Sequence, residues 1–478
     1  MIKKPIKFSF LVIYFWALTF ITGCCNLKAP SNTDEFWTPP KWEKTTKSID
    51  RVWQSVREQK FDLSKPLTLA KVINITLKNN PALRQAMDNA VAAHARVKQA
   101  EGTWYPQVTA TGDFTKDRKF ANLKDDSYNT RSYGGKAEAN LLALDFGGRA
   151  ASVKEAYHEL IAANYEFNQQ LQDVILDAEK FYYTFYSAKS SLEAAEDNTA
   201  DAEVSFYVAN EKLQTGISSR LDMLQAKSNY EQSLFEQEEA KGDVKSAKAD
   251  LAEIMGLPAD IPLEIAFPSW KMPVDITEKD VTELIDMALK KRPDIAASRA
   301  NLRAKEAAVR VTDSDLMPEL KVGGTAEKDW TQYFGDNKAF KHFYEYTGFL
   351  KLSWNVFDGF ENYAEKKEAE AQAKVERVKL MQDELAASAD VWTQYYTYET
   401  AVSKLKFSKA FLKSSSESYD LALTGYKAGL KGILDLLQAQ SQLSDARSKV
   451  VQSRKDLYIS LVELAHATGS IGIKGSEE

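Results

Sequence analysis

The strongest constraint on the fold of this 478-residue chain is an internal duplication. The run Asn80-Pro81-Ala82-Leu83 corresponds to Arg292-Pro293-Asp294-Ile295, at an offset of 212 residues. Further pairs keep this offset to within one residue: Tyr105-Pro106 with Met317-Pro318, Gly216 with Gly429, Leu221-Asp222-Met223-Leu224-Gln225-Ala226 with Leu434-Asp435-Leu436-Leu437-Gln438-Ala439, and Gly256 with Gly469. This regularity predicts two copies of one structural unit, a first repeat over 66–260 and a second over 275–472, with a linker over 261–274.

Each repeat is expected to contain one very long helix. From Val153 to Leu213 apolar residues recur at alternating spacings of four and three, which is the seam of a coiled coil. A helix over about 149–213 would be roughly 95–100 Å long. The second repeat keeps the pattern more loosely over about 361–426, and shorter helices are expected at about 81–105 and 218–256. This pattern alone leaves a plain coiled-coil rod open.

The segments between the helices alternate polar and apolar residues with period two. Each repeat therefore predicts one hairpin, at about 106–145 and 318–358, with strands of about 10–14 residues that could cross a bilayer at a tilt. Polar loops are expected at about 119–131 and 333–344. Aromatic residues bracket the strands in two belts: Trp104, Tyr105, Phe146, Trp354 and Phe357 at one end, and Tyr133, Trp330, Tyr333, Phe334, Phe343, Tyr344 and Tyr346 at the other. A soluble hairpin that only clasps a partner is the alternative.

Four strands cannot close a membrane barrel, and lipid does not tolerate an open sheet edge. Two chains would supply eight strands, too narrow for a large cargo, and three would supply twelve. Several chains must therefore share one barrel, and the predicted fold class is mainly α with a transmembrane β-barrel contribution: an oligomer in which a long coiled-coil tube joins a small barrel with four strands per protomer.

The first residues form an export signal. Lys3, Lys4 and Lys7 precede an apolar stretch over 8–21, and Ile21-Thr22-Gly23-Cys24 resembles a bacterial lipobox. This predicts a lipoprotein signal peptide over 1–23 and a lipid on Cys24. Cleavage by ordinary signal peptidase, leaving Cys24 and Cys25 as free thiols, is the alternative. Residue 25 is not the Asp that retains such lipoproteins in the inner membrane, which favours the outer membrane. An extended arm is expected over 24–65 and a short tail over 473–478.

Together these features resemble the outer-membrane efflux family of TolC-type channels, and within it the lipoprotein branch that serves RND pumps. The resemblance covers about residues 36–472. It rests on the duplication, the proline after each short helix, the turns over 144–149 and 357–359, and the repeated Gly…Leu-Asp-x-Leu-Gln-Ala. It implies a homotrimer in outer-membrane lipids, with a twelve-stranded barrel and a long periplasmic α-helical coiled-coil barrel closed at its inner end. It also implies contact with a periplasmic adaptor (membrane fusion) protein and an inner-membrane pump. The implied function is an exit duct for small molecules, drugs or metal ions.

The two turns at the far ends of the long helices are the candidate gate. Gly216 and Gly429 suit left-handed helix caps and would present backbone to the adaptor. Asp222 and Asp435 follow each glycine by six residues, which predicts six carboxylates in a trimer. The resemblance implies a constriction at Asp435, with Gln438 where the family often has a second carboxylate. It also implies a closed-state latch in which Tyr426 and Lys431 contact Asp222. Charges that merely keep a helix end soluble are the alternative.

Other functions find little support in the sequence. The four histidines fall in separate segments without metal-ligand spacing, and no phosphate-binding loop is present, so we expect no enzyme, no cofactor and no metal centre. The net charge is −6, and it becomes −9 once the three signal-peptide lysines are removed, so we expect no nucleic-acid partner. Two alternatives stay open: a type I protein-secretion duct of the same fold, and a non-conducting coiled-coil lipoprotein that spaces the envelope.

Overall fold

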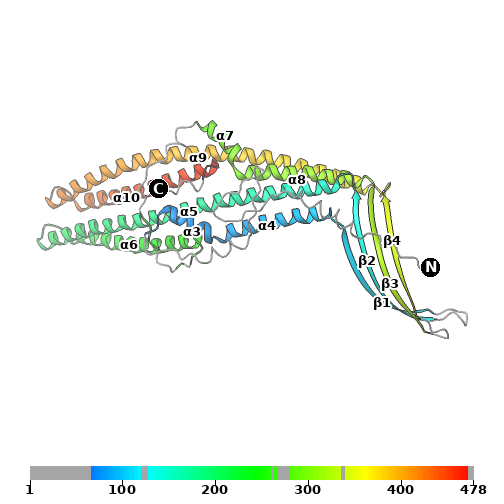
Figure 1. Ribbon diagram of the computed structural model, residues 1–478. Coiled ribbons are helices and arrows are strands. Elements are labelled where there is room, and N and C mark those ends of the chain that lie inside the picture. Colours follow the sequence, from blue (N-terminus) through cyan, green and yellow to red (C-terminus); the bar gives the residue numbers. More distant parts are fainter. Residues whose placement is uncertain are drawn as a thin grey trace, which may run out of the picture.

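A computed structural model describes residues 66–119, 128–257, 259, 263–266, 280–334 and 340–471. Figure 1 shows an elongated molecule in which helices run side by side and a curved sheet extends from one end. The expected signal peptide, Cys24, the arm over 24–65, most of the linker and the tail lie outside the described residues.

Among the described residues, each repeat contains four helices. In the first repeat they are α3 Leu69–Asn79, α4 Pro81–Gly102, α5 Gly148–Gln214 and α6 Arg220–Ile254; in the second they are α7 Val281–Lys291, α8 Pro293–Asp315, α9 Glu361–Lys427 and α10 Ile433–Ala467. The two long helices have 67 residues each, about 100 Å, and confirm the expected coiled-coil elements. The short helices α3 and α7 were not expected. Among the described helices, none has a stretch long and apolar enough to cross a membrane.

The short helices pack in two tiers along the long ones. The helices α4 and α6 both contact α5, while α8 and α10 both contact α9 and also α5 (Figure 1). Side by side, the order is therefore α4–α5–α8–α9 near the sheet and α6–α5–α10–α9 in the far half. The chain thus forms a curved wall one helix thick, with α4 and α6 at one edge and α9 at the other.

The repeat is preserved in contacts as well as in sequence. The side-chain amide of Asn80 donates to the carbonyl of Ile254 at 3.1 Å, and the Arg292 guanidinium donates to the carbonyl of Ala467 at 3.2 Å. Each contact ties the junction of two short helices to the end of the returning helix. A glycine with positive φ follows each returning helix, Gly256 at +66° and Gly469 at +64°. A β-carbon on Gly256 would lie 2.8 Å from the Asn79 carbonyl oxygen, so only glycine fits this close approach.

The sheet consists of four antiparallel strands in the order β1-β2-β3-β4: β1 Gln107–Lys119, β2 Tyr128–Leu144, β3 Glu319–Phe334 and β4 Phe340–Ser353. Four strands per chain were expected. The strands have 13, 17, 16 and 14 residues, so three of the four run at or beyond the upper end of the expected length. They extend into segments that we had expected to be loops.

The register sorts side chains onto two faces of the sheet. Residues that pair across neighbouring strands form rows, and successive rows face opposite sides of the sheet. Two rows on one side are Val108–Ala139–Gly324–Gly348 and Ala110–Ala137–Ala326–Tyr346. The row between them, on the other side, is Thr109–Glu138–Thr325–Thr347. One face therefore carries mainly apolar and aromatic residues: Val108, Phe114, Tyr133, Leu141, Val322, Trp330, Tyr344, Tyr346, Leu350 and Leu352. The other face carries mainly polar and charged residues: Asp113, Lys136, Glu138, Lys321, Glu327, Asp329, Glu345 and Lys351. This alternation is typical of a strand with lipid on one side and water on the other.

Both lateral edges of the described chain are open. The strands β1 and β4 each have a neighbour on one side only. Helix α9 exposes an apolar stripe along its length: Val375, Val378, Leu385, Trp392, Phe407 and Leu421, each at least half exposed. At the opposite edge Phe235 on α6 is 70% exposed. The apolar stripe on α9, the exposed Phe235 on α6 and the unpaired strands β1 and β4 are typical of surfaces that pack against another chain.

Candidate gate at the helix tips

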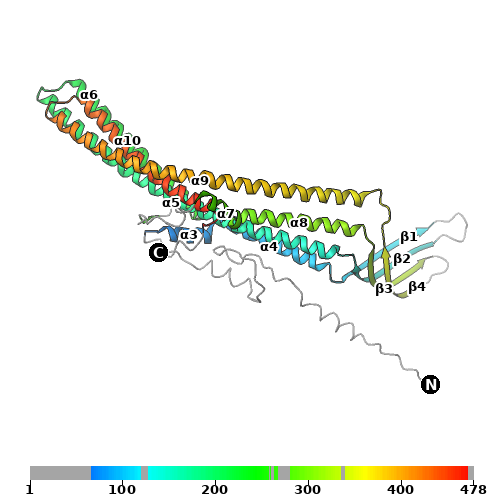
Figure 2. The same cartoon turned by 90° about the horizontal axis from the view of Figure 1, so that it is seen from above.

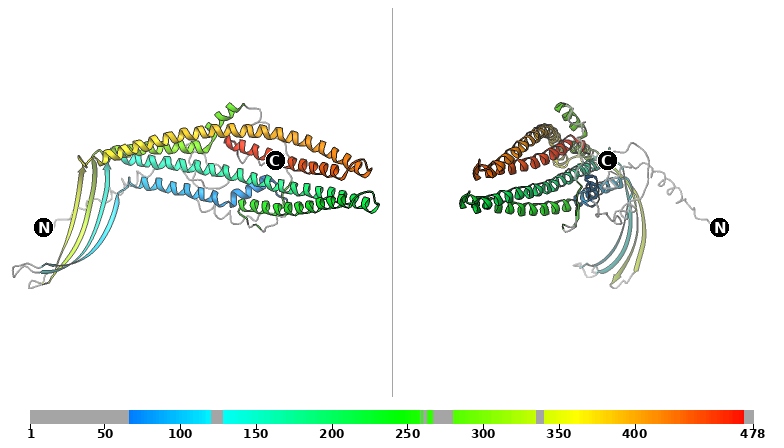
Figure 3. Two further views of the ribbon diagram at one scale, coloured as in Figure 1. Left: turned by 180° about the vertical axis from the view of Figure 1, so that it is seen from behind. Right: turned by 90° about the vertical axis from the view of Figure 1, so that its left-hand side faces the viewer.

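Both helical hairpins, α5–α6 and α9–α10, end at the end of the molecule opposite the sheet (Figure 2), and Figure 3 views them from behind and from one end. Gly216 has φ +75° and Gly429 has φ +77°, the left-handed conformation expected of them. The N–H of Ile217 donates to the carbonyl of Lys212 at 2.9 Å, and the N–H of Leu430 donates to the carbonyl of Gly425 at 2.8 Å. The two turns are therefore closed by equivalent hydrogen bonds. No described heavy atom lies within 4 Å of a β-carbon built on either glycine, so both turns are uncovered.

The repeated aspartates lie in the first turn of each returning helix, where they cap it. Asp222 accepts hydrogen bonds from the Ser218 and Ser219 hydroxyls at 2.8 and 2.9 Å, and the Ser219 hydroxyl accepts from the Asp222 N–H at 3.2 Å. The Ser218 hydrogen bond is the main cause that lowers the pKa of Asp222. Asp435 accepts from the N–H of Gly432 at 3.1 Å. Each carboxylate therefore stabilises its helix locally, whatever else it does.

The two aspartates differ in how exposed their carboxylates are and in how many of the carboxylate oxygens already accept hydrogen bonds. Asp222 is half-buried and both of its oxygens are engaged by serines. Asp435 is exposed, and Gln438, one turn further along the same face of α10, is exposed too. The second tip therefore presents to solvent an amide and a carboxylate that accepts only the Gly432 N–H, whereas both carboxylate oxygens at the first tip are engaged by serine hydroxyls.

Tyr426 joins the two tips, but its partner differs from the one expected. Its ring is buried in a cluster with Ala209 and Ala226 of the first hairpin. The Lys212 ammonium lies 4.3 Å from the centre of this ring and donates to the Tyr426 carbonyl. Burial, and secondarily the charge of Asp222, raise the pKa of Tyr426. Its hydroxyl is buried beside the Ser218 side chain, which opposes this rise in pKa.

Lys431 does not reach Asp222 within the described part of the chain. Its aliphatic stem lies against Gly425 instead, where a β-carbon would be 2.8 Å from Lys431 Cγ. The two direct latch contacts to Asp222 are thus not made within one chain, because the serines occupy the carboxylate and Lys431 folds onto its own turn. The cation that holds Tyr426 is Lys212, which the sequence reasoning missed.

A polar network beside the tips also joins the repeats. The Arg447 guanidinium donates to Asn198 at 2.6 Å and to Asp201 at 2.8 Å, and Asn198 donates to Ser444 at 2.8 Å. The Ser205 hydroxyl donates to the side-chain oxygen of Gln440 at 3.1 Å and extends the network. Its members recur at spacings of three and four on α5 and on α10, a signal that the sequence carried and that the apolar seam obscured.

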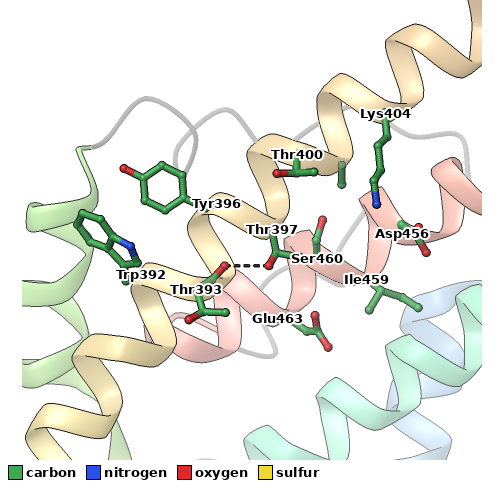
Figure 4. A pocket seen from close by; sticks show the side chains of 11 residues that line it. Trp392, Thr393, Tyr396, Thr397, Thr400, Lys404, Asp456, Ile459, Ser460 and Glu463 are labelled. Atoms are coloured by element: carbon green, nitrogen blue, oxygen red, sulfur yellow. Dashed lines mark hydrogen bonds between the residues drawn. The ribbon is translucent and has the colours of Figure 1, made fainter.

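A cavity of about 660 Å³ lies on α9 and α10 (Figure 4). Figure 4 shows Trp392 and Tyr396 together on α9 and Lys404 facing Asp456 of α10. The two rings lie 5.1 Å apart and are about half exposed. This cavity therefore lies at the α9 edge, one of the two open edges of the helical wall. Across the described residues, no group of three or more His, Cys, Asp or Glu side chains could hold a metal ion.

Comparison with known proteins identifies the family. The sequence model of the outer membrane efflux protein family matches residues 72–257 and 284–470. Protein CyaE of Bordetella pertussis is 27% identical over 410 residues, which cover 85% of this chain and 85% of that protein. The probable efflux pump outer membrane protein TtgC of Pseudomonas putida is 22% identical over 463 residues, covering 94% of this chain and 93% of that protein.

A solved structure of the outer-membrane channel OprN has the same fold, with a TM-score of 0.71 at 19% identity over 92% of this chain and 99% of that one. The expected fold class, mainly helical with four strands per chain, is therefore confirmed, as is the resemblance read from the sequence. The family model matches one long range in each half of the chain and more than half of its residues. The chain belongs to the outer membrane efflux protein family.

Proposed function

We propose that this protein is the outer-membrane exit duct of a tripartite efflux system and that three copies close into one channel. The observation that carries the proposal is the four-stranded sheet with one apolar face, one charged face and two open edges. Three copies joined between β4 and β1 give twelve strands, with the charged face lining the water-filled interior. The cargo is a small molecule such as a drug or a metal ion.

The same closure joins the helical walls. The apolar stripe of α9 meets the α4 and α6 edge of the next copy, and that copy covers the cavity containing Trp392 and Tyr396. Such burial of half-exposed aromatic and aliphatic side chains favours the assembled state at about 25 cal/mol for each Å² of apolar surface removed from water. No catalytic step forms part of the proposal.

The tips are the proposed contact with the periplasmic adaptor, which in turn meets an inner-membrane pump of the RND type. Gly216 and Gly429 support this assignment because nothing in the described chain covers them and their backbone is accessible. Asp435 and Gln438 are proposed to line the constriction, since both are exposed on one face of α10. Asp222, Tyr426, Lys431 and Lys212 are proposed to set how firmly the entrance stays closed.

The function is tested by conductance and by export in the same strain. Purified full-length protein should form discrete channels in planar bilayers, and deletion of its gene should raise drug susceptibility. Loss of a secreted polypeptide with unchanged susceptibility would instead favour a protein-secretion duct. Absence of any conductance from correctly folded oligomer would leave only an envelope spacer.

The gate is tested by removing one cation from each tip. We expect Lys212→Met to increase the open probability in planar bilayers, because it removes the ring contact and the carbonyl hydrogen bond that tie the hairpins together, worth about 1–3 kcal/mol. Lys427→Met is the matched control, since Lys427 is exposed on the last turn of α9. Equal open probabilities of the two variants would contradict the role of Lys212.

We propose that Cys24 carries the lipid. Cells grown with labelled palmitate should label the wild type and the Cys25→Ser variant but not the Cys24→Ser variant, because lipid attaches to the cysteine that becomes the mature N-terminus. Label retained by Cys24→Ser would reject the assignment.

A further inference from the structure

A small basic cavity lies between α5 and α8, close to the sheet. Its volume is about 360 Å³ and its lining is Lys154, His158, Arg303, Glu306, Ala307 and Arg310. Lys154 and His158 are four residues apart on α5, and the α8 residues fall at spacings of three and four, so each set occupies one helix face. The buried methyl group of Ala307 lies between the two arginines in sequence and leaves room where a longer side chain would fill the cavity.

The charges around this cavity are not balanced. Within the described part of the chain, Lys154, Arg303 and Arg310 form no ion pair. Glu306, the acidic member of the lining, is already engaged by Arg377 at 3.1 Å. Three cations held beside one another repel, and a bound anion would relieve that repulsion.

His158 adds an unsatisfied polar atom to the same cavity. Its Nδ1 is buried and has no hydrogen-bond partner among the described residues. Burial, followed by the positive charges of Lys154 and Arg303, lowers the pKa of His158, with Glu306 opposing. A buried ring nitrogen without a partner is costly unless a ligand or water satisfies it.

The position of the cavity decides what can reach it. Lys154 lies six residues after the start of α5 and Arg310 five residues before the end of α8, about 7–9 Å along the helix axes from the ends that face the sheet, whereas His158 and Arg303 lie about 15–18 Å from those ends. The headgroup layer of a bilayer adds roughly 5–8 Å beyond the hydrocarbon on each side, so the long side chains of Lys154 and Arg310 reach it at the end of the cavity nearer the sheet. Moreover, α5 and α8 are the two middle helices of the wall, so a copy joined at α4 or α9 does not cover the cavity.

We propose that this cavity binds a phosphate group, free or as the headgroup of an anionic lipid, between the guanidinium groups of Arg303 and Arg310, with Lys154 and the Nδ1–H of His158 completing the site. Guanidinium groups match phosphate oxygens in pairs, and the lysine and imidazole supply single donors. A trimer would carry three such sites around the top of its helical tube. The inference goes beyond the duct function, and only its lipid arm depends on the placement of the sheet in a membrane.

The test is ligand binding by the full-length protein in neutral detergent. In one arm inorganic phosphate is added to the protein, with chloride at equal ionic strength as the control. In the other arm phosphatidylglycerol is added, with diacylglycerol as the control. Binding is followed by thermal shift and native mass spectrometry. The double variant Arg303→Gln/Arg310→Gln should weaken binding about tenfold or more, because two charge-assisted contacts are lost. Arg299→Gln is the matched control, since Arg299 lies on the same face of α8 outside the lining and pairs with Glu384 at 2.9 Å.

Each outcome decides the proposal. A tenfold loss with the lipid alone identifies a headgroup site, and the same loss with phosphate alone identifies a site for a free anion. Equal binding by the wild type and the double variant in both arms overturns the proposal. If the double variant does not fold, Lys154→Met should show a smaller loss in the same arm, and wild-type binding by Lys154→Met overturns the proposal equally. Because no readout uses conductance, failure here is distinguishable from failure of the duct function.

Discussion

Replacing Ala326 with arginine should abolish assembly of the protein in the outer membrane, whereas replacing the adjacent Thr325 with arginine should not. Ala326 lies in the middle of β3, in the apolar row with Ala137 and Tyr346. An arginine facing lipid near the bilayer midplane costs about 2–4 kcal/mol in each chain, and a trimer carries three. The measurement is the amount of heat-modifiable oligomer in outer-membrane fractions, together with drug susceptibility.

Thr325→Arg is a stringent control because it changes the same strand by the same side chain. Thr325 faces the opposite side, in a row with Glu138 and Thr347, where a cation finds water and a carboxylate. If both variants assembled equally well, the sheet would not have lipid on its apolar face. If both failed, the two faces would be equally buried, and the interior of the barrel would not be aqueous.

Replacing Gly256 with valine should lower the stability of the helical region by about 3–5 kcal/mol. The residue has φ +66°, which a β-branched side chain adopts only with strain, and its β-carbon would meet the Asn79 carbonyl oxygen at 2.8 Å. The expected result is a large fall in the midpoint of thermal unfolding and early cleavage by protease near the junction of α3 and α4.

Gly242→Ala is the contrasting substitution in the same hairpin. Gly242 lies inside α6, no described heavy atom lies within 4 Å of a β-carbon built on it, and alanine is the better helix former by about 0.5–1 kcal/mol. We therefore expect a slightly raised unfolding midpoint. Since Gly469 repeats the geometry of Gly256, with a β-carbon 3.0 Å from the Arg292 nitrogen, Gly469→Val should reproduce the first result in the second repeat.

The sequence predicts most of the fold because its signals extend over many residues. A seam kept for about sixty residues defines α5 almost to its ends, and period-two alternation defines the strands. The helices α3 and α7 escaped because they have only 11 residues each and end where Pro81 and Pro293 begin the next helix. Strand lengths were underestimated because the period-two alternation gives way at the outer ends to mixed polar and aromatic residues, as in the end of β3, Trp330-Thr331-Gln332-Tyr333-Phe334.

The candidate site is less predictable because it depends on residues far apart in the chain. The capping of α6 could have been read from Ser219 and Asp222, which are three residues apart. The contact of Lys212 with Tyr426 joins residues 214 positions apart, and no local pattern indicates how two hairpin tips meet. The family resemblance implied contacts of Tyr426 and Lys431 with Asp222 and gave no indication of Lys212, because it carries positions across without showing which way a flexible side chain turns.

The divergence of the two repeats has a consequence for symmetry. If both halves had stayed identical, a ring of three chains would present six equal hairpins, and any protein docking beneath it would find six equivalent seats. Here the first hairpin contributes Lys212 and a satisfied Asp222, while the second contributes Tyr426 and an exposed Asp435. In the proposed trimer the ring of tips would therefore have only threefold symmetry, with two kinds of hairpin in alternation. Substitutions in one kind would then alter the aperture while the other kind stays unchanged for the proposed adaptor.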